Sequence, residues 1–85
     1  MHPVNPKTYN LSTRIKLLQD NAGSLFIVIN RKSRIIMKDG IRVVKIAERI
    51  KEVNQNKKIS LLTSAPVCSK TKTLLLKNNI SVLSF

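Results

Sequence analysis

Apolar residues in the last third of the chain fall into three groups with different spacing. Residues 59–63 and 80–85 are short apolar runs, whereas the apolar residues between Pro66 and Asn78 recur at helical spacing. A helix between two short strands is typical of a parallel crossover, because parallel strands require a long connection. We therefore predict a strand, a helix and a parallel strand in succession over residues 59–85.

The middle of the chain combines an uninterrupted apolar strand with the clearest helix pattern. Leu25–Ile29 contains no polar residue, so both faces of this strand are expected to be covered, as in a central strand flanked by helices. From Asp39, which can cap it, a helix is expected to run to Val53, with a mixed-charge face that includes Arg42 and that we interpret as solvated. Between them, Arg34–Lys38 is expected to form either a short strand paired back as a hairpin or a loop with buried apolar side chains.

The N-terminal part of the chain shows a weaker pattern. Residues 1–9 are polar and interrupted by prolines, so we expect a flexible arm. Asn10 can then cap a short helix in which Leu11, Ile15 and Leu18 share one face, and the Asp-Asn-Ala-Gly stretch that follows would close it. One amphipathic helix is therefore expected before the first strand.

Together these elements predict one small α/β domain over residues 10–85. Its layered fold would have a mostly parallel sheet of three to four strands flanked by helices, in the approximate order α-β-(β)-α-β-α-β. A chain of 85 residues can bury a modest core, but not a core together with a roomy enclosed active site.

The charge of the chain exceeds what solubility needs, and an anionic partner could explain the excess. Sixteen Lys and Arg residues against four Asp and Glu residues give a formal net charge of +12, whereas solubility of a small domain needs roughly 2–8 charges. Nucleic acid, an anionic membrane or an acidic protein could supply the opposite charge. A membrane partner is not expected, because the longest apolar run, Leu25–Ile29, is far shorter than the roughly 20 residues that span a bilayer.

Cysteine content and the polar N-terminus bear on the compartment. Cys68 is the only cysteine, which excludes an internal disulfide framework and a multi-cysteine metal site. No secretory signal is recognisable at the start of the chain. We therefore expect an intracellular, cytoplasmic protein, and we expect no cofactor.

Two polar segments follow predicted strands at their carboxyl ends, where open sheets of this class bind ligands. Residues 31–34 hold three cations whose repulsion a bound polyanion would relieve; the alternative is a solvated turn. Residues 63–72 offer hydroxyls and lysines around a helix start, which favours an anion; the alternative is ordinary helix capping. The predicted residues are Arg31, Lys32, Arg34, Lys70 and Lys72 for nucleic acid, Ser64 and Ser69 for an anion, and Arg14, Lys16, Lys57 and Lys58 as peripheral cations.

Residues for catalysis are scarce. Asp20 and Asp39 lie at predicted helix ends, and Glu48 and Glu52 lie on an exposed helix face, so no pair is placed for metal-dependent hydrolysis or general acid–base chemistry. No glycine-rich phosphate loop is present. The sequence therefore leans against an enzyme.

Cys68 is the one candidate nucleophile. It lies near a helix N-terminus with Lys70 and Lys72 close by, and both features lower the pKa of a thiol. The order strand, Ala-Pro-Val-Cys and helix resembles the active-site start of glutaredoxin-type domains, although the second cysteine of that motif is absent. Cys68 also precedes Leu75 by two helical turns on the apolar stripe, which favours a small buried hydrophobe.

The order of the elements resembles the minimal core of restriction-endonuclease-like nucleases, in which a strand carries an acid followed by a lysine. The corresponding place in this chain reads Ile29-Asn30-Arg31-Lys32 and holds no carboxylate. The resemblance therefore implies a metal-free relative that binds without cleaving.

We conclude from the sequence that the chain is a small basic protein that binds the phosphates of DNA or RNA with little sequence specificity. Its three aromatic residues are too few for binding that relies on stacked bases. A non-enzymatic module for an acidic protein partner is the alternative, and a thiol-dependent enzyme that uses Cys68 is the lesser one. A homodimer stays open, since the apolar strand that ends at Phe85 could lie at an interface.

Overall fold

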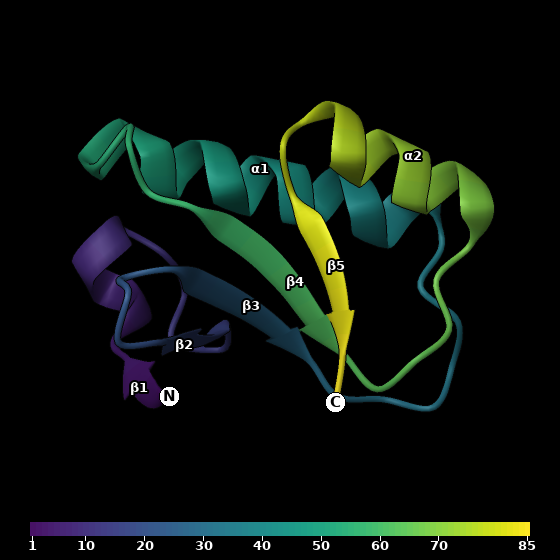
Figure 1. Ribbon diagram of the computed structural model, residues 1–85, viewed down its shortest axis with the longest axis horizontal. Helices are drawn as coiled ribbons and strands as arrows, with labels where there is room; N and C mark the ends of the chain where they lie inside the picture. Colours follow the sequence, from purple (N-terminus) through teal and green to yellow (C-terminus); the bar gives the residue numbers. More distant parts are fainter.

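A computed structural model describes all 85 residues and contains a five-stranded sheet with two α-helices. The elements in chain order are β1 (His2–Val4), the 3-10 helix η1 (Pro6–Tyr9), β2 (Lys16–Gln19), β3 (Leu25–Ile29), α1 (Met37–Val53), β4 (Ile59–Thr63), α2 (Ser69–Lys77) and β5 (Ser81–Ser84). Figure 1 shows the sheet with both helices above it. The predicted α/β class is confirmed.

The sheet is mixed, so the prediction of a mostly parallel sheet is wrong. The strands lie side by side in the order β1-β2-β3-β4-β5. β1, β2 and β3 pair antiparallel, whereas β3 with β4 and β4 with β5 are parallel. The predicted strand, helix and parallel strand over residues 59–85 are confirmed as β4, α2 and β5.

The helix predicted over residues 11–18 is absent, and the segment contains β2 instead. The side-chain carboxylate of Asp20 accepts hydrogen bonds from the backbone N–H groups of Ala22 at 3.0 Å and Ser24 at 2.9 Å. Gly23 completes this turn with a φ of +87°, a conformation that glycine adopts without strain. The residues interpreted as a helix end thus form the hairpin turn from β2 to β3.

Residues 1–9, expected to form an arm, belong instead to the sheet and the core. β1 pairs with β2, and Pro6 begins η1, where a missing N–H group costs nothing. Asn5 caps η1 by accepting a hydrogen bond from the backbone N–H of Lys7 at 3.0 Å. Tyr9 is buried in the main hydrophobic cluster.

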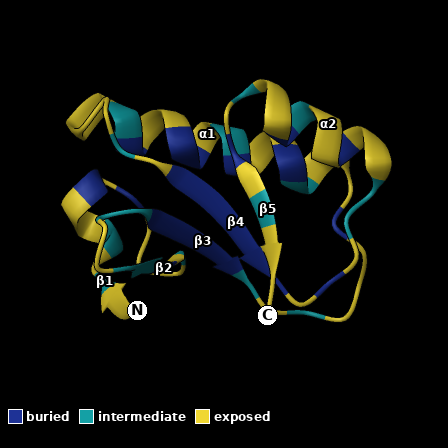
Figure 2. Cartoon of the chain, viewed as in Figure 1, coloured by how far each residue is buried: buried dark blue, intermediate teal, exposed yellow.

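Both helices cover the same face of the sheet (Figure 1), not opposite faces as predicted. The crossovers from β3 to β4 and from β4 to β5 advance in the same direction along the sheet. Because crossovers between parallel strands have one common hand, two that advance in the same direction place their helices on the same side. Figure 2 shows β3 and β4 buried beneath them. Alternate residues of these strands form a smaller cluster on the other face, Phe26, Val28 and Leu62.

The segment between β3 and α1 is a loop, and the alternative of a hairpin strand is not formed. Ile35 is fully buried and makes an isolated parallel bridge with Val67. Ile36 and Met37, which were expected to be buried in the loop alternative, are exposed. α1 begins at Met37, and Asp39 caps it from within the first turn by accepting a hydrogen bond from the N–H of Ile36 at 3.0 Å.

α1 and α2 pack closely at Gly40. A Cβ atom at this position would lie 2.6 Å from Cγ2 of Thr71, which is closer than real Cβ contacts. Glycine therefore permits the approach of the two helix N-terminal turns. Neither helix is long and apolar enough to cross a lipid bilayer.

Candidate nucleic-acid interface

The loops that follow β3 and β4 run side by side from the sheet to the helix N-termini (Figure 1). The N–H of Ile35 donates to the carbonyl of Pro66 at 2.9 Å, and the N–H of Cys68 donates to the carbonyl of Ile35 at 3.0 Å. Because these groups bond the neighbouring loop, α2 begins at Ser69 and not at Pro66 as predicted. We call residues 30–36 and 64–70 the loop edge.

Ser64 ties the two halves of the loop edge together. Its hydroxyl donates to the side-chain oxygen of Asn30 at 2.8 Å and accepts from the backbone N–H of Arg31 at 3.2 Å. From the sequence, Ser64 is expected to be an anion ligand or a helix cap. In the structure its hydroxyl joins the loops, and Cys68 is the N-cap of α2.

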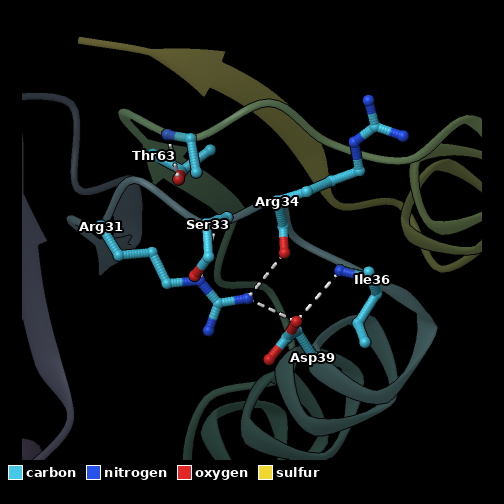
Figure 3. A network of polar contacts seen from close by, with 7 residues as sticks. Arg31, Ser33, Arg34, Ile36, Asp39 and Thr63 are labelled. Carbon is cyan, nitrogen blue, oxygen red and sulfur yellow. Dashed lines mark hydrogen bonds and ion pairs between the residues drawn. The ribbon is translucent and has the colours of Figure 1, made fainter.

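Arg31 is the centre of a polar network at the start of α1 (Figure 3). Its guanidinium donates to the Asp39 carboxylate, to the carbonyl of Arg34 at 3.1 Å and to the carbonyl of Ser33 at 3.2 Å. Hydrogen bonds from Arg31 and from the N–H of Ile36 hold the pKa of Asp39 below its ordinary value of 3.8. This is the one ion pair of the chain, so Arg31 orders the loop as well as carrying charge.

Arg34 points away from this network (Figure 3). Its exposed side chain lines an open concavity with Ser69 and Lys70, together with Pro66, Val67 and Cys68. No acidic residue lines that concavity. The structure thus brings together two of the predicted cations and one of the predicted hydroxyls, although they come from separate loops.

Cys68 lies partly exposed in the same concavity, so the expectation of a buried hydrophobe is wrong. Backbone N–H groups of Lys70 and Thr71 lower the pKa of its thiol below the ordinary 9.0, and the positive charge of Arg34 adds to this shift. The cause is its N-cap position, where the first turn of a helix presents unpaired N–H groups.

The other two predicted cations do not line this concavity. Lys32 is exposed in the loop after β3. Lys72 lines an adjacent hollow with Thr63 and the end of β5. These two lysines add positive charge near the loop edge without sharing the Arg34 and Lys70 concavity.

A second cationic region lies between β2, β3 and the start of α1, which we call the cationic cavity. It has a volume of about 170 Å³. Its charged lining residues are Arg14, Lys16, Arg31, Asp39 and Arg42, and its apolar lining residues are Ile15, Ile27, Val28, Ile29, Val43 and Ile46. Lys16 reaches it because β2 pairs antiparallel with β3 and places Lys16 opposite Val28.

Sequence reasoning missed Arg42 and ranked Arg14 and Lys16 as peripheral. One signal could have identified Arg42, because it follows Asp39 by three residues and the two therefore share a helix face. The positions of Arg14 and Lys16 depend on β2, whose sequence predicts a helix. The cavity therefore could not be assembled from the predicted elements.

Lys57 and Lys58 lie at the other end of the sheet. The carbonyl of Lys58 accepts a hydrogen bond from the N–H of Leu25, the first residue of β3, at 2.8 Å. A five-residue strand separates them from the loop edge, which corresponds to about 13 Å. They do not join the other predicted cations.

The described side chains offer little for a metal ion. No group of three His, Cys, Asp or Glu residues is close enough to hold one. The polar groups at the loop edge and in the cationic cavity are mostly hydrogen-bond donors with positive charge. Such an arrangement can bind and orient an anion.

Comparison with known proteins shows similarity in fold. No family model matches the chain, and no curated protein matches it. Among solved structures, EndoMS in its apo form has a similar fold, with a TM-score of 0.62 and 17% sequence identity. The match covers 95% of this chain and 39% of that chain, so this chain spans well under half the length of that structure.

Proposed function

We propose that the domain binds nucleic acid through phosphate groups at the loop edge. The observation that carries this proposal is the convergence of Arg34 and Lys70 around one concavity that no acidic residue lines. Guanidinium and ammonium groups are the usual protein ligands of phosphate. Lys32, which is exposed in the same loop as Arg34, and Lys72, which lines an adjacent hollow, add further positive charge.

The distribution of acidic residues supports the same conclusion. Asp39 is engaged by Arg31, and Asp20 lies in the β2–β3 turn at the opposite end of the sheet. Glu48 and Glu52 lie in the second half of α1. The field at the loop edge is therefore positive, and contacts of this kind follow the backbone and give little base readout.

The structural comparison makes nucleic acid the first partner class to test. The fold is shared with part of EndoMS, and the order of the elements resembles the minimal core of restriction-endonuclease-like nucleases. Cleavage is not proposed for this chain, because Asn30 and Arg31 follow β3 where a nuclease-like site would need a carboxylate. Binding without cleavage is the part of the likeness that we propose.

Fluorescence anisotropy tests this proposal with labelled duplex DNA and single-stranded RNA at two salt concentrations. We expect the affinity to fall steeply with salt, with a slope that reports roughly 4–7 neutralised phosphates. The double variant Arg34→Ala/Lys70→Ala is expected to weaken binding roughly tenfold, and equally on unrelated sequences.

The matched control is Lys57→Ala/Lys58→Ala, which removes the same charge at the other end of the sheet and is expected to cost less. An acidic peptide of equal charge serves as the competitor. Equal losses in both double variants would overturn the loop edge as the binding surface. Preference for the peptide over both nucleic acids would replace the proposal with an acidic protein partner.

A further inference from the structure

The cationic cavity has more cations than its one carboxylate can neutralise. Its four cations and one carboxylate leave an excess of three positive charges. Arg31 is held by Asp39. The side chains of Arg14, Lys16 and Arg42 make no ion pair, since the Arg31 pair is the only one in the chain. Unpaired cations that converge on a recess repel one another, and a bound anion would relieve that repulsion.

The dimensions of the cavity restrict the class of anion. A volume of about 170 Å³ is smaller than the roughly 300–1,000 Å³ of sites that bury drug-sized ligands, a class that includes a nucleoside. One tetrahedral oxyanion with a few waters fits this space, at about 30 Å³ for each water. The apolar walls that Ile27, Val43 and Ile46 provide lower the local dielectric constant and strengthen attraction to such an anion.

Arg31 connects this cavity to the loop edge. Its guanidinium lines the cavity, while its backbone belongs to the loop after β3. A strand whose backbone phosphates lie along the loop edge can therefore place its end in the cavity. An internal phosphate is a poorer fit, because the sugars on both of its sides would have to enter the recess.

We propose that the cationic cavity binds the terminal phosphate monoester of a nucleic-acid strand. This proposal rests on the proposed function of the loop edge. A monoester carries about two negative charges at neutral pH, whereas an internal diester carries one. Arg14, Lys16 and Arg42 contact its free oxygens, and the fixed guanidinium of Arg31 orients it. The chain then distinguishes phosphorylated from unphosphorylated ends.

The test compares oligonucleotides of one sequence that carry a 5′-phosphate, a 3′-phosphate or only hydroxyl ends. The unchanged protein is expected to bind a phosphorylated end at least about fivefold more tightly. Lys16→Gln/Arg42→Gln removes exposed side chains and is expected to abolish this preference, while retaining most of the affinity for the hydroxyl-ended strand. Lys51→Gln/Lys77→Gln, with the same charge change outside the cavity, is expected to keep the preference.

Failure of this inference can be told apart from failure of the proposed function. If phosphorylated and hydroxyl-ended strands bind equally, the cavity inference is overturned and the loop edge stands. If no oligonucleotide binds, the proposed function fails and the nucleic-acid part of the inference fails with it. Titration with inorganic phosphate, followed through the amide resonances of Val28 and Ile29, then decides whether any anion site exists. If phosphate shifts neither amide resonance, the inference of an anion site in the cationic cavity is overturned entirely.

Discussion

The loop edge and the cationic cavity lie at the same end of the sheet but hold their charges differently. At the loop edge, Arg34 and Lys70 are exposed and make no ion pair. In the cavity, Arg31 is fixed by a carboxylate and two carbonyl groups, and apolar side chains line the wall. Exposed, unpaired charges favour salt-sensitive contacts with many sequences, whereas a recess that holds one fixed cation among several unpaired ones can select an anion by its shape.

The largest effect is expected from a change in the packing of α1 against α2, the two helices that follow the loops of the loop edge. Gly40 of α1 lies against α2, where a Cβ would stand 2.6 Å from Cγ2 of Thr71. Gly40→Ala is expected to lower the free energy of unfolding by about 1–2 kcal/mol, because overpacking outweighs the gain in helix propensity. Urea denaturation measures this change.

Thr71→Ser provides the control, because it removes the methyl group that Gly40→Ala would meet and keeps the hydroxyl. In the Thr71→Ser background, Gly40→Ala is expected to be neutral or stabilising. An equal loss of stability in both backgrounds would contradict the close helix contact as its cause.

A smaller effect is expected from replacing Arg31 or its neighbour Lys32. Comparison of the two variants separates the effect on stability from the effect on binding. Arg31→Met is expected to lower the free energy of unfolding by about 0.5–1.5 kcal/mol, since it removes a partly exposed ion pair and two hydrogen bonds to carbonyl groups. Lys32→Met removes the same charge but is expected to change stability by less than about 0.5 kcal/mol while it weakens nucleic-acid binding. Urea denaturation and anisotropy on both variants check the contrast; similar stabilities would contradict it.

The contribution of Arg31 should depend on pH through Asp39. The pKa of Asp39 is lowered from 3.8 in the folded state. The unfolded state therefore binds a proton first as pH falls, so the stabilisation is complete above the unfolded pKa and is lost as pH falls through the folded pKa. The difference in unfolding free energy between the unchanged protein and Arg31→Met should thus narrow below pH 3.8.

The smallest effect is expected from modification of Cys68, which lines the loop edge but not the cavity. Its lowered pKa predicts that alkylation reaches half its maximal rate below pH 9.0. Iodoacetate adds a negative charge, and iodoacetamide adds a neutral group of similar size. We expect the charged adduct to bind nucleic acid a few-fold more weakly. The preference for a phosphorylated end should be the same in both adducts, and its loss in the charged adduct alone would show that the two regions are one site.

The second half of the chain could be predicted because local signals and tertiary contacts agree there. β4 and β5 match apolar runs, and α1 follows a buried stripe that includes Val43, Ile46 and Ile50. Asn79 follows α2 in the left-handed conformation, with a φ of 60°, which is common where a helix ends and which asparagine tolerates. The adjacency of Arg34 and Lys70 follows from the same pattern, because the carboxyl ends of parallel strands meet at one edge.

The first part of the chain could not be predicted correctly, because its apolar positions fit both a helix and a strand. Leu11, Ile15 and Leu18 have helical spacing, yet Leu17 is the residue of β2 that the core buries. A strand of four residues shows too few alternations to reveal a period of two. Pairing with β3, which lies beyond the turn, decides the outcome.

The sequence by itself therefore determined the positive charge, the α/β class, α1 and the parallel unit formed by β4, α2 and β5, because each of these rests on composition or on local periodicity. Only the tertiary structure decided that both helices share one face, that β2 is a strand, and that Arg14 and Lys16 meet Arg42. Those features depend on which strands pair and in which direction, and that choice is made by burial across the whole sheet and not by any single segment.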